Sequence, residues 1–114
     1  ATIIVIKIKG TNQIVGGYNP LDWEGSGIYK KTQDSFIFIF NDYRDINTDK
    51  IGRVTNASHA LICNPLRGPI FGSNDIEMYY NDNKWGSNPN FYPNLNIPGS
   101  FEIDDYEAFQ VVEK

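Results

Sequence analysis

The chain has 114 residues, 40% of them apolar, which suffices for one domain with a modest core and excludes two domains. Its net charge is −4 and no stretch concentrates lysine or arginine, so nucleic acid is not an expected partner. The longest apolar runs have four or five residues, whereas a membrane-spanning helix needs about 20, so membrane insertion is excluded.

The first half of the chain predicts short β-strands. Residues 2–9 are apolar and then alternate with period two, which is typical of a strand. Turn residues at 10–12 and a second apolar run at 13–18 complete a predicted β-hairpin. Residues 21–32 show no period and predict an ordered loop, whereas residues 35–40 are apolar on both faces and predict a strand inside a sheet.

The second half predicts more strands separated by polar connections. Strands are expected at 50–54 and 59–63, joined as a hairpin or through a one-turn helix. A glycine-bounded unit at 68–72 precedes a strand at 75–80, and the Asn- and Pro-rich residues 81–100 predict a long irregular loop. Strands at 100–103 and 106–112 close the chain, on either side of an acidic turn.

These seven to nine short strands, without any long helical period, predict the fold class. We expect a mainly β fold, with little helix, in which two antiparallel sheets form a sandwich or a distorted barrel. No internal repeat indicates a propeller or a solenoid.

Catalytic and metal-binding chemistry finds little support in the residue pattern. His59 and Cys63 are the only histidine and the only cysteine, and on a strand they would lie about 13 Å apart, too far for a nucleophile and its base. One Cys and one His cannot form a zinc site. We therefore expect no catalytic residue, no metal and no cofactor. A lone cysteine also favours a reducing, intracellular setting.

An acidic group near the C-terminus consists of Asp104, Asp105 and Glu107. Paired carboxylates serve as acid and base in glycosidases, but adjacent residues of a strand point to opposite faces. We interpret the three residues as solvent-exposed, and as a candidate surface for a protein partner.

Four blocks of glycine and aromatic residues occur in the order and rough spacing of a TLDc domain. They lie at residues 14–23, 34–38, 68–76 and 101–111, spread over nearly the whole chain. In particular, the chain resembles the TLDc domains at the end of fungal BTB/kelch-like proteins. The residues that match the motifs are Gly16, Gly17, Tyr18, Trp23, Ser35, Phe36, Gly68, Pro69, Phe71, Gly72, Asp75, Glu107 and Phe109.

The resemblance implies that residues 1–114 form a partial TLDc domain, roughly its C-terminal two-thirds. The family domain has an additional N-terminal helical portion with a Phe-His-x-x-Cys-type segment, and its sandwich carries flanking helices. The resemblance also implies a cytoplasmic, non-catalytic interaction domain linked to oxidative-stress resistance. Its implied partner is a protein, with vacuolar ATPase subunits as the candidates.

The motif residues themselves predict structural roles. Glycines are expected where the backbone needs a positive φ or a close approach, at Gly16, Gly17, Gly68 and Gly72. Aromatic side chains are expected to fill the core between the sheets, at Trp23, Phe36, Phe38, Phe71 and Phe109.

Two other functions stay open at this point. The first is a redox enzyme or oxidant scavenger, in which Cys63, Met78 or exposed tyrosines react with peroxide. The second is a carbohydrate-binding β-sandwich that uses Trp23 and Trp85 on its surface. Solvent exposure of the two tryptophans would favour the carbohydrate-binding function over the interaction domain.

Overall fold

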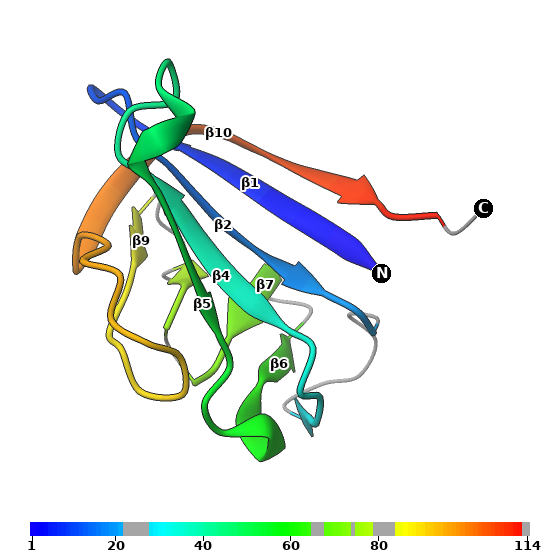
Figure 1. Cartoon of the computed structure of the whole chain (residues 1–114). Helices are drawn as coiled ribbons and strands as arrows, with labels where there is room; N and C mark the ends of the chain where they lie inside the picture. Colours follow the sequence, from blue (N-terminus) through cyan, green and yellow to red (C-terminus); the bar gives the residue numbers. More distant parts are fainter. Residues whose placement is uncertain (22–27, 65–67, 74, 79–83, 113–114) are drawn as a thin grey trace.

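The computed structural model describes residues 1–21, 28–64, 68–73, 75–78 and 84–112, and in these ranges it is mainly β (Figure 1). The strands are β1 (Thr2–Ile8), β2 (Ile14–Asn19), β3 (Ile28–Lys30), β4 (Phe36–Phe40), β5 (Asp49–Arg53), β6 (Leu61–Asn64), β7 (Gly68–Phe71), β8 (Glu77–Met78), β9 (Lys84–Gly86) and β10 (Ser100–Gln110). Two single-turn 3-10 helices, η1 (Ile46–Thr48) and η2 (Ala57–His59), complete these elements. Neither of these helices has the length and apolarity needed to cross a membrane.

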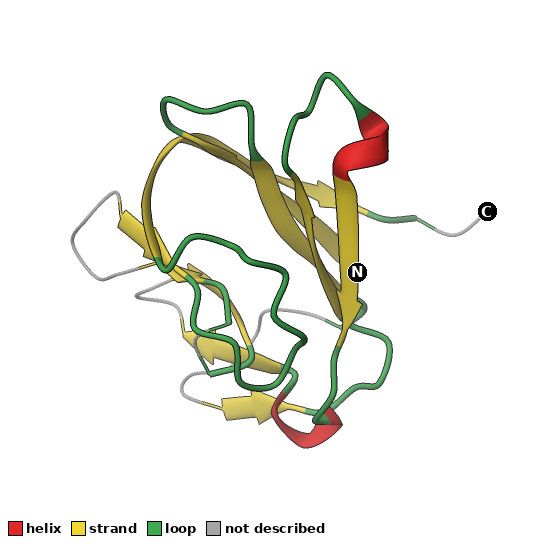
Figure 2. Ribbon diagram, turned by 60° about the vertical axis from the view of Figure 1, so that its left-hand side comes forward, coloured by secondary structure: helices red, strands yellow, loops and turns green. Residues whose placement is uncertain are grey.

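The strands form two antiparallel sheets, as expected for a sandwich. The larger sheet has seven strands in the order β5-β4-β2-β1-β10-β9-β8, and the smaller sheet has the order β3-β6-β7. Figure 2 shows the larger sheet curling over the shorter strands beneath it. The inner face of the larger sheet meets the smaller sheet, and we call the opposite face the outer face.

Strand β1 lies between β2 and β10, so its alternation decides which residues enter the core. Thr2–Lys7 pair with Ile14–Asn19 of β2, and the hairpin turns at Gly10, whose φ is +75°. Ile4, Ile6 and Ile8 point inward and are at most 3% exposed. Because side chains alternate along a strand, Ile3, Val5 and Lys7 point to the outer face.

The core lies between the sheets and is closed at one side by the irregular segment 87–99. The larger sheet contributes Ile4, Ile6, Ile8, Val15, Ile37, Ile39, Trp85 and Phe101. The smaller sheet and its connections contribute Ala60, Leu61, Phe71 and Ile76, and the segment 87–99 contributes Tyr92, Leu95 and Ile97. This segment is irregular, as the sequence predicts, yet it forms part of the core.

Three details of the predicted element order are wrong. The predicted loop 21–32 contains β3, and the predicted loop 81–100 contains β9. The predicted acidic turn at 104–105 is part of the continuous strand β10. There the pairing with β1 outweighs the charged sequence, because seven consecutive residues of β1 find partners in β10.

The connection between β5 and β6 follows one of the two predicted alternatives. It contains the one-turn helix η2, and the two strands lie in different sheets, so they do not form a hairpin. The chain therefore passes from the larger sheet to the smaller sheet at η2.

The predicted aromatic core is only partly correct. Phe71 is fully buried, but Phe36 and Phe38 lie on the outer face because Ile37 and Ile39 take the inward positions of β4. Phe109 is 51% exposed, on the outer face of β10. Trp23 lies outside the described residues.

The expectation for the glycines is confirmed at three positions. Gly16 and Gly17 are close-approach sites without a positive φ, and Gly72 has a φ of +65°. Gly68 begins β7, and its surroundings lie outside the described residues.

Candidate functional site

The outer face of the larger sheet carries three rows of side chains that cross five strands. Residues that are paired in register lie side by side on the same face, so the rows follow from the strand pairing. One row contains Phe109, Ile3, Tyr18, Phe36 and Arg53. The second contains Glu107, Val5, Gly16, Phe38 and Ile51, and the third contains Asp105, Lys7, Ile14, Phe40 and Asp49.

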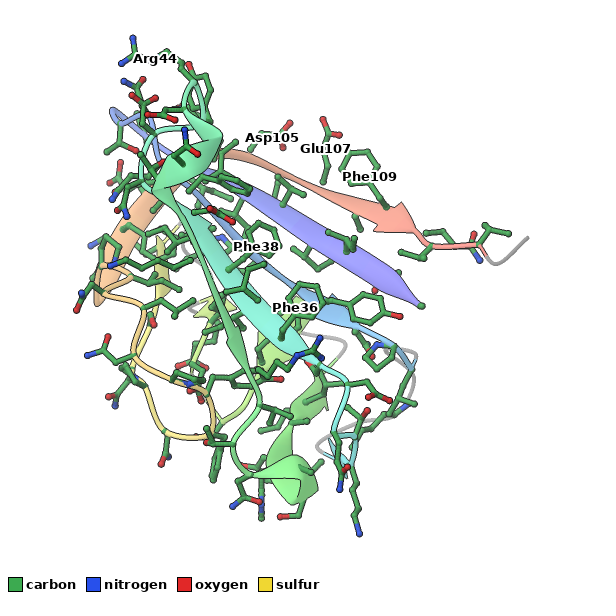
Figure 3. The ribbon with its side chains drawn as sticks, in the orientation of Figure 1. Phe36, Phe38, Arg44, Asp105, Glu107 and Phe109 are labelled. Atoms are coloured by element: carbon green, nitrogen blue, oxygen red, sulfur yellow. The ribbon has the colours of Figure 1, made fainter. Side chains whose placement is uncertain are left out.

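The middle of this face is apolar and partly exposed. Figure 3 shows Phe36 and Phe38 on the same side of β4. The Tyr18 and Phe36 rings lie 5.3 Å apart, and the Phe38 and Phe40 rings lie 5.9 Å apart. At the rim, Ile51 is 61% exposed. Contiguous apolar surface of this kind marks a place where another segment or molecule packs.

Toward β10 the apolar face leads into a hollow of about 210 Å³. Its lining is Val5 and Lys7 of β1 with Asp105, Tyr106, Glu107 and Phe109 of β10. Asp105, Glu107 and Phe109 project from the same side of β10 (Figure 3). The hollow therefore combines apolar side chains with the carboxylates that the sequence predicts as a partner surface.

Asp104 differs from its two acidic neighbours because it is the extra residue of a β-bulge. Lys7 pairs with Asp105 and Ile8 pairs with Ile103, so Asp104 has no partner residue in β1. Its carboxylate accepts a hydrogen bond from Lys7 Nζ at 3.2 Å, and the same ammonium group donates to the carbonyl oxygens of Ile8 and Thr11. Asp104 therefore pairs with Lys7, the cation among the described residues that line the hollow.

The other two carboxylates of the acidic group lack a cation within the described residues. Asp105 Oδ1 accepts the backbone N–H of Tyr106 at 2.8 Å, and Glu107 is exposed. Arg44, labelled at the top of Figure 3, instead pairs with Asp42 at 3.0 Å and holds the pKa of that carboxyl below its usual range. The surface around Asp105 and Glu107 is consequently acidic and accessible.

Asp75, a motif residue, has a structural role. It is 1% exposed, and its carboxylate accepts the backbone N–H groups of Asn90, Phe91 and Tyr92 at 2.8–3.2 Å. Burial raises the pKa of Asp75, while these backbone hydrogen bonds act to lower it. The three bonds fix the segment 87–99 against the core.

Ser35 takes part in a second buried connection between the layers. Its hydroxyl donates to the Tyr18 carbonyl at 2.8 Å and lies 2.7 Å from the Tyr92 hydroxyl, which donates to the Ala60 carbonyl at 2.6 Å. Burial, the largest effect, raises the pKa of Tyr92 far above its ordinary value, so the phenol stays protonated. The chain of hydroxyls joins β2 to the η2–β6 junction.

Gly16 and Gly17 complete this structural set. A Cβ at Gly16 would lie 2.7 Å from Phe38 Cζ, so that ring covers the glycine on the outer face. A Cβ at Gly17 would lie 2.6 Å from Phe71 Cζ in the core. Pro69 lies in β7, and its side chain is outside the described part. Of the described motif residues, Gly17, Ser35, Phe71 and Asp75 thus make contacts in the interior, Gly16, Tyr18 and Phe36 lie on the outer face, and Glu107 and Phe109 are exposed.

The structure describes only some of the residues considered for catalysis, redox chemistry or carbohydrate binding. The His59 ring stacks on Phe91 with centroids 5.0 Å apart and meets Tyr29 edge-on at 4.4 Å, while the side chains of Cys63 and Met78 lie outside the described part. Trp85 is fully buried, so its predicted surface role is wrong. Among the described residues, no three His, Cys, Asp or Glu side chains form a group that could hold a metal.

Sequence reasoning misses the β1 side of the hollow. It treats Val5 and Lys7 only as members of a strand, although they line the hollow. The signal that points to them is the run Ile3–Ile6, which is apolar on both faces of a strand whose inner face alone fills the core. A strand of this kind requires a second contact surface on its outer face.

Comparison with known proteins identifies the family. The family model for the TLDc domain matches residues 1–112. Searches of curated proteins and of solved structures return no significant match. The match spans almost the whole chain and includes both sheets, the buried motif residues and the acidic group of β10. The chain belongs to the TLDc domain family.

Proposed function

We propose that this TLDc domain is a non-catalytic interaction module. It binds a protein partner through the acidic group of β10, meaning Asp104, Asp105 and Glu107, and through the adjoining hollow. The observation that carries the proposal is a pair of exposed carboxylates, Asp105 and Glu107, which line an apolar hollow. Neither carboxylate forms an ion pair with a cation of the described residues. Apolar surface with unpaired charge at its rim is typical of a protein interface.

At the finer level, the proposed partners are subunits of the vacuolar ATPase, and the proposed role is resistance to oxidative stress in the cytoplasm. Family membership supports this assignment. An interaction role also suits a fold whose described polar groups in the interior, Asp75, Ser35 and Tyr92, are engaged in hydrogen bonds that hold the layers together. The acidic group is an accessible charged feature that is open to a partner.

The test is a pull-down of vacuolar ATPase subunits with the full-length protein, together with survival of cells exposed to peroxide. Replacing Asp105 by Asn and Glu107 by Gln removes two exposed charges, which lowers affinity by about 2- to 30-fold. The loss should shrink at high salt because screening weakens the charge pairs of the unmodified protein. Glu102→Gln is the matched control, since Glu102 lies on the same strand, is exposed and pairs with Lys9 outside the hollow. Equal retention of the subunits by all variants contradicts the proposal.

We also propose that the apolar part of the outer face over β4 and β5 is covered by the N-terminal portion of the complete TLDc domain. Support comes from the exposed or partly exposed Phe36, Phe38, Phe40 and Ile51 on this face. Consequently the 114-residue chain should bind a hydrophobic dye and melt at a lower temperature than the full-length protein. A cooperative, high-temperature melt of the monomeric chain without dye binding would contradict this assignment.

A further inference from the structure

Strand β10 has two halves with different surroundings. Ser100–Glu102 pair with Lys84–Gly86 of β9 on one side, and residues 103–110 pair with β1 on the other. From Tyr106 to Gln110, no strand of the described chain pairs with the second side of β10. We call Tyr106–Gln110 the free edge, and Figure 1 shows this part of β10 extending away from the body of the molecule toward the C-terminus.

The hydrogen-bond ladder between β1 and β10 shows which backbone groups of the free edge can bond to another strand. Val111 N donates to the Ala1 carbonyl, and in an antiparallel pair every second residue points its N–H and C=O at the partner strand. Asp105, Glu107 and Phe109 therefore direct these groups toward β1. The N–H and C=O groups of Tyr106, Ala108 and Gln110 point away from β1, into the space beside the sheet.

One of these donors is already engaged. Asp105 Oδ1 accepts the Tyr106 N–H at 2.8 Å, which shields this position. The Ala108 and Gln110 N–H groups and the Tyr106 and Ala108 carbonyls remain available on a strand whose residues 104–110 are all exposed. An edge of this kind is a template for one more strand.

We propose that the free edge of β10 binds an extended segment of a protein partner as an added antiparallel strand, with basic residues of that segment on the outer face. The inference rests on the proposed function, since it names the kind of protein segment that binds at the acidic group. Backbone hydrogen bonds to Ala108 and Gln110 provide the contact, and side chains beside Glu107 provide the selectivity.

Charge complementarity indicates which kind of strand binds at the free edge. Asp105 and Glu107 stand on the outer face, while Lys7, opposite Asp105 in the ladder, is paired with Asp104, and Arg44 is paired with Asp42. A second copy of this chain, paired about Glu107, would place like charges opposite each other, which is unfavourable. A lysine or arginine fits instead, because its aliphatic stem can lie against Phe109 while its charged head reaches Glu107.

The first experiment measures binding of a capped eight-residue peptide of alternating lysine and valine to the chain by titration calorimetry. In the proposed register the valines lie opposite Ala108 and Gln110, so their N–H groups face β10 and the lysine N–H groups face solvent. Methylating the valine nitrogens should abolish binding, whereas methylating the lysine nitrogens should leave the affinity within about twofold. Equal loss with both methylated peptides, or binding with both, overturns the strand addition.

The second experiment varies the protein. Ala108→Pro removes an N–H of the free edge without touching the ladder to β1 and should abolish peptide binding, whereas the control Ala108→Thr should retain it. Glu107→Gln should weaken the lysine peptide by about three- to fivefold at low salt. Unchanged binding by Ala108→Pro, or equally tight binding of a glutamate–valine peptide, overturns the proposal. If the subunits depend on Asp105 and Glu107 in the pull-down while the lysine peptide fails to bind, the strand addition is wrong and the proposed function stands.

Discussion

Replacing Gly17 by Ala tests how the two sheets are held together. Gly17 lies in β2 at a φ that is not positive, so the substitution introduces no backbone strain. The added Cβ would instead lie 2.6, 2.7 and 2.9 Å from Cζ, Cε1 and Cε2 of Phe71. Carbon atoms in contact prefer about 3.5–4.0 Å, so the ring must retreat by about 1 Å.

Phe71 has little room for such a shift. Its side chain is fully buried, and its ring meets the Tyr92 ring edge-on with centroids 6.3 Å apart. Tyr92 is itself fixed by its hydrogen bond to the Ala60 carbonyl. Overpacking of a filled core costs about 1–3 kcal/mol, so we expect Gly17→Ala to lower the free energy of unfolding by about 2 kcal/mol. Gly17→Val adds two more methyl groups and should cost more.

Urea denaturation followed by circular dichroism gives this free energy, and the midpoint should fall while the slope stays constant. Gly99→Ala is the matched control, because the nearest atom to its added Cβ would be Ser87 O at an ordinary 3.7 Å. The double variant Gly17→Ala with Phe71→Leu should be less destabilised than the sum of the two single changes, since a smaller side chain relieves the clash. Additive losses, or a stable Gly17→Ala, would refute the packing argument.

Substitutions at three further positions separate the roles of the core, the outer face and the thiol. Asp75→Ala removes the acceptor of three N–H donors, of which that of Tyr92 is buried, and we expect a loss of about 3 kcal/mol in chemical denaturation together with faster amide exchange at residues 90–92. Because burial raises the pKa of Asp75, the folded chain binds this proton more tightly than the unfolded chain. The contribution of Asp75 to the free energy of unfolding therefore falls as the pH rises from 3.8 through the raised pKa, and Asp75→Asn should remove this slope from a series of melts at different pH. Ile51→Lys places a charge on the exposed outer face, and it should reduce hydrophobic dye binding while changing stability by less than about 0.5 kcal/mol. Cys63→Ser should leave protection against peroxide in cells intact, because no lysine or arginine lies near it in the sequence before Arg67. Loss of protection in a stably folded Cys63→Ser variant would favour the redox function instead.

Local sequence patterns predict the elements that are determined by neighbouring residues in the sequence. The β1–β2 hairpin, β4 and the class of fold follow from β-branched runs and turn residues, and the structure confirms each of them. The close-approach glycines are also predictable, since a Gly-Gly pair inside an apolar strand is typical of a place where another group contacts the backbone. The family motif points to Asp75 and Ser35, but their hydrogen-bond partners lie 15–57 residues away and cannot be inferred from spacing.

The errors concern features that depend on distant parts of the chain. A period-two pattern says that the two faces of β4 differ, but both faces are apolar, so nothing in the pattern tells whether the phenylalanines or the isoleucines point inward. The short strands β3 and β9 have three residues each and exist only because β6 and β10 provide partners. The strand through Asp104–Tyr106 is likewise imposed by pairing with β1, against a sequence that favours a turn.

The bulge at Asp104 explains why the acidic group and the free edge occur at the same place. An extra residue bends and twists a strand, and here the bulge separates the part of β10 that pairs with β9 from the part that does not. Exposed edges tend to pair with further copies of the same chain, and charged side chains on the edge oppose that association. Asp105 and Glu107 meet this requirement while leaving the Ala108 and Gln110 N–H groups accessible. In the proposed binding mode, the carboxylates that disfavour pairing with a second copy of this chain are also the groups that favour a strand of opposite charge, so protection of the edge and partner selectivity depend on one set of residues.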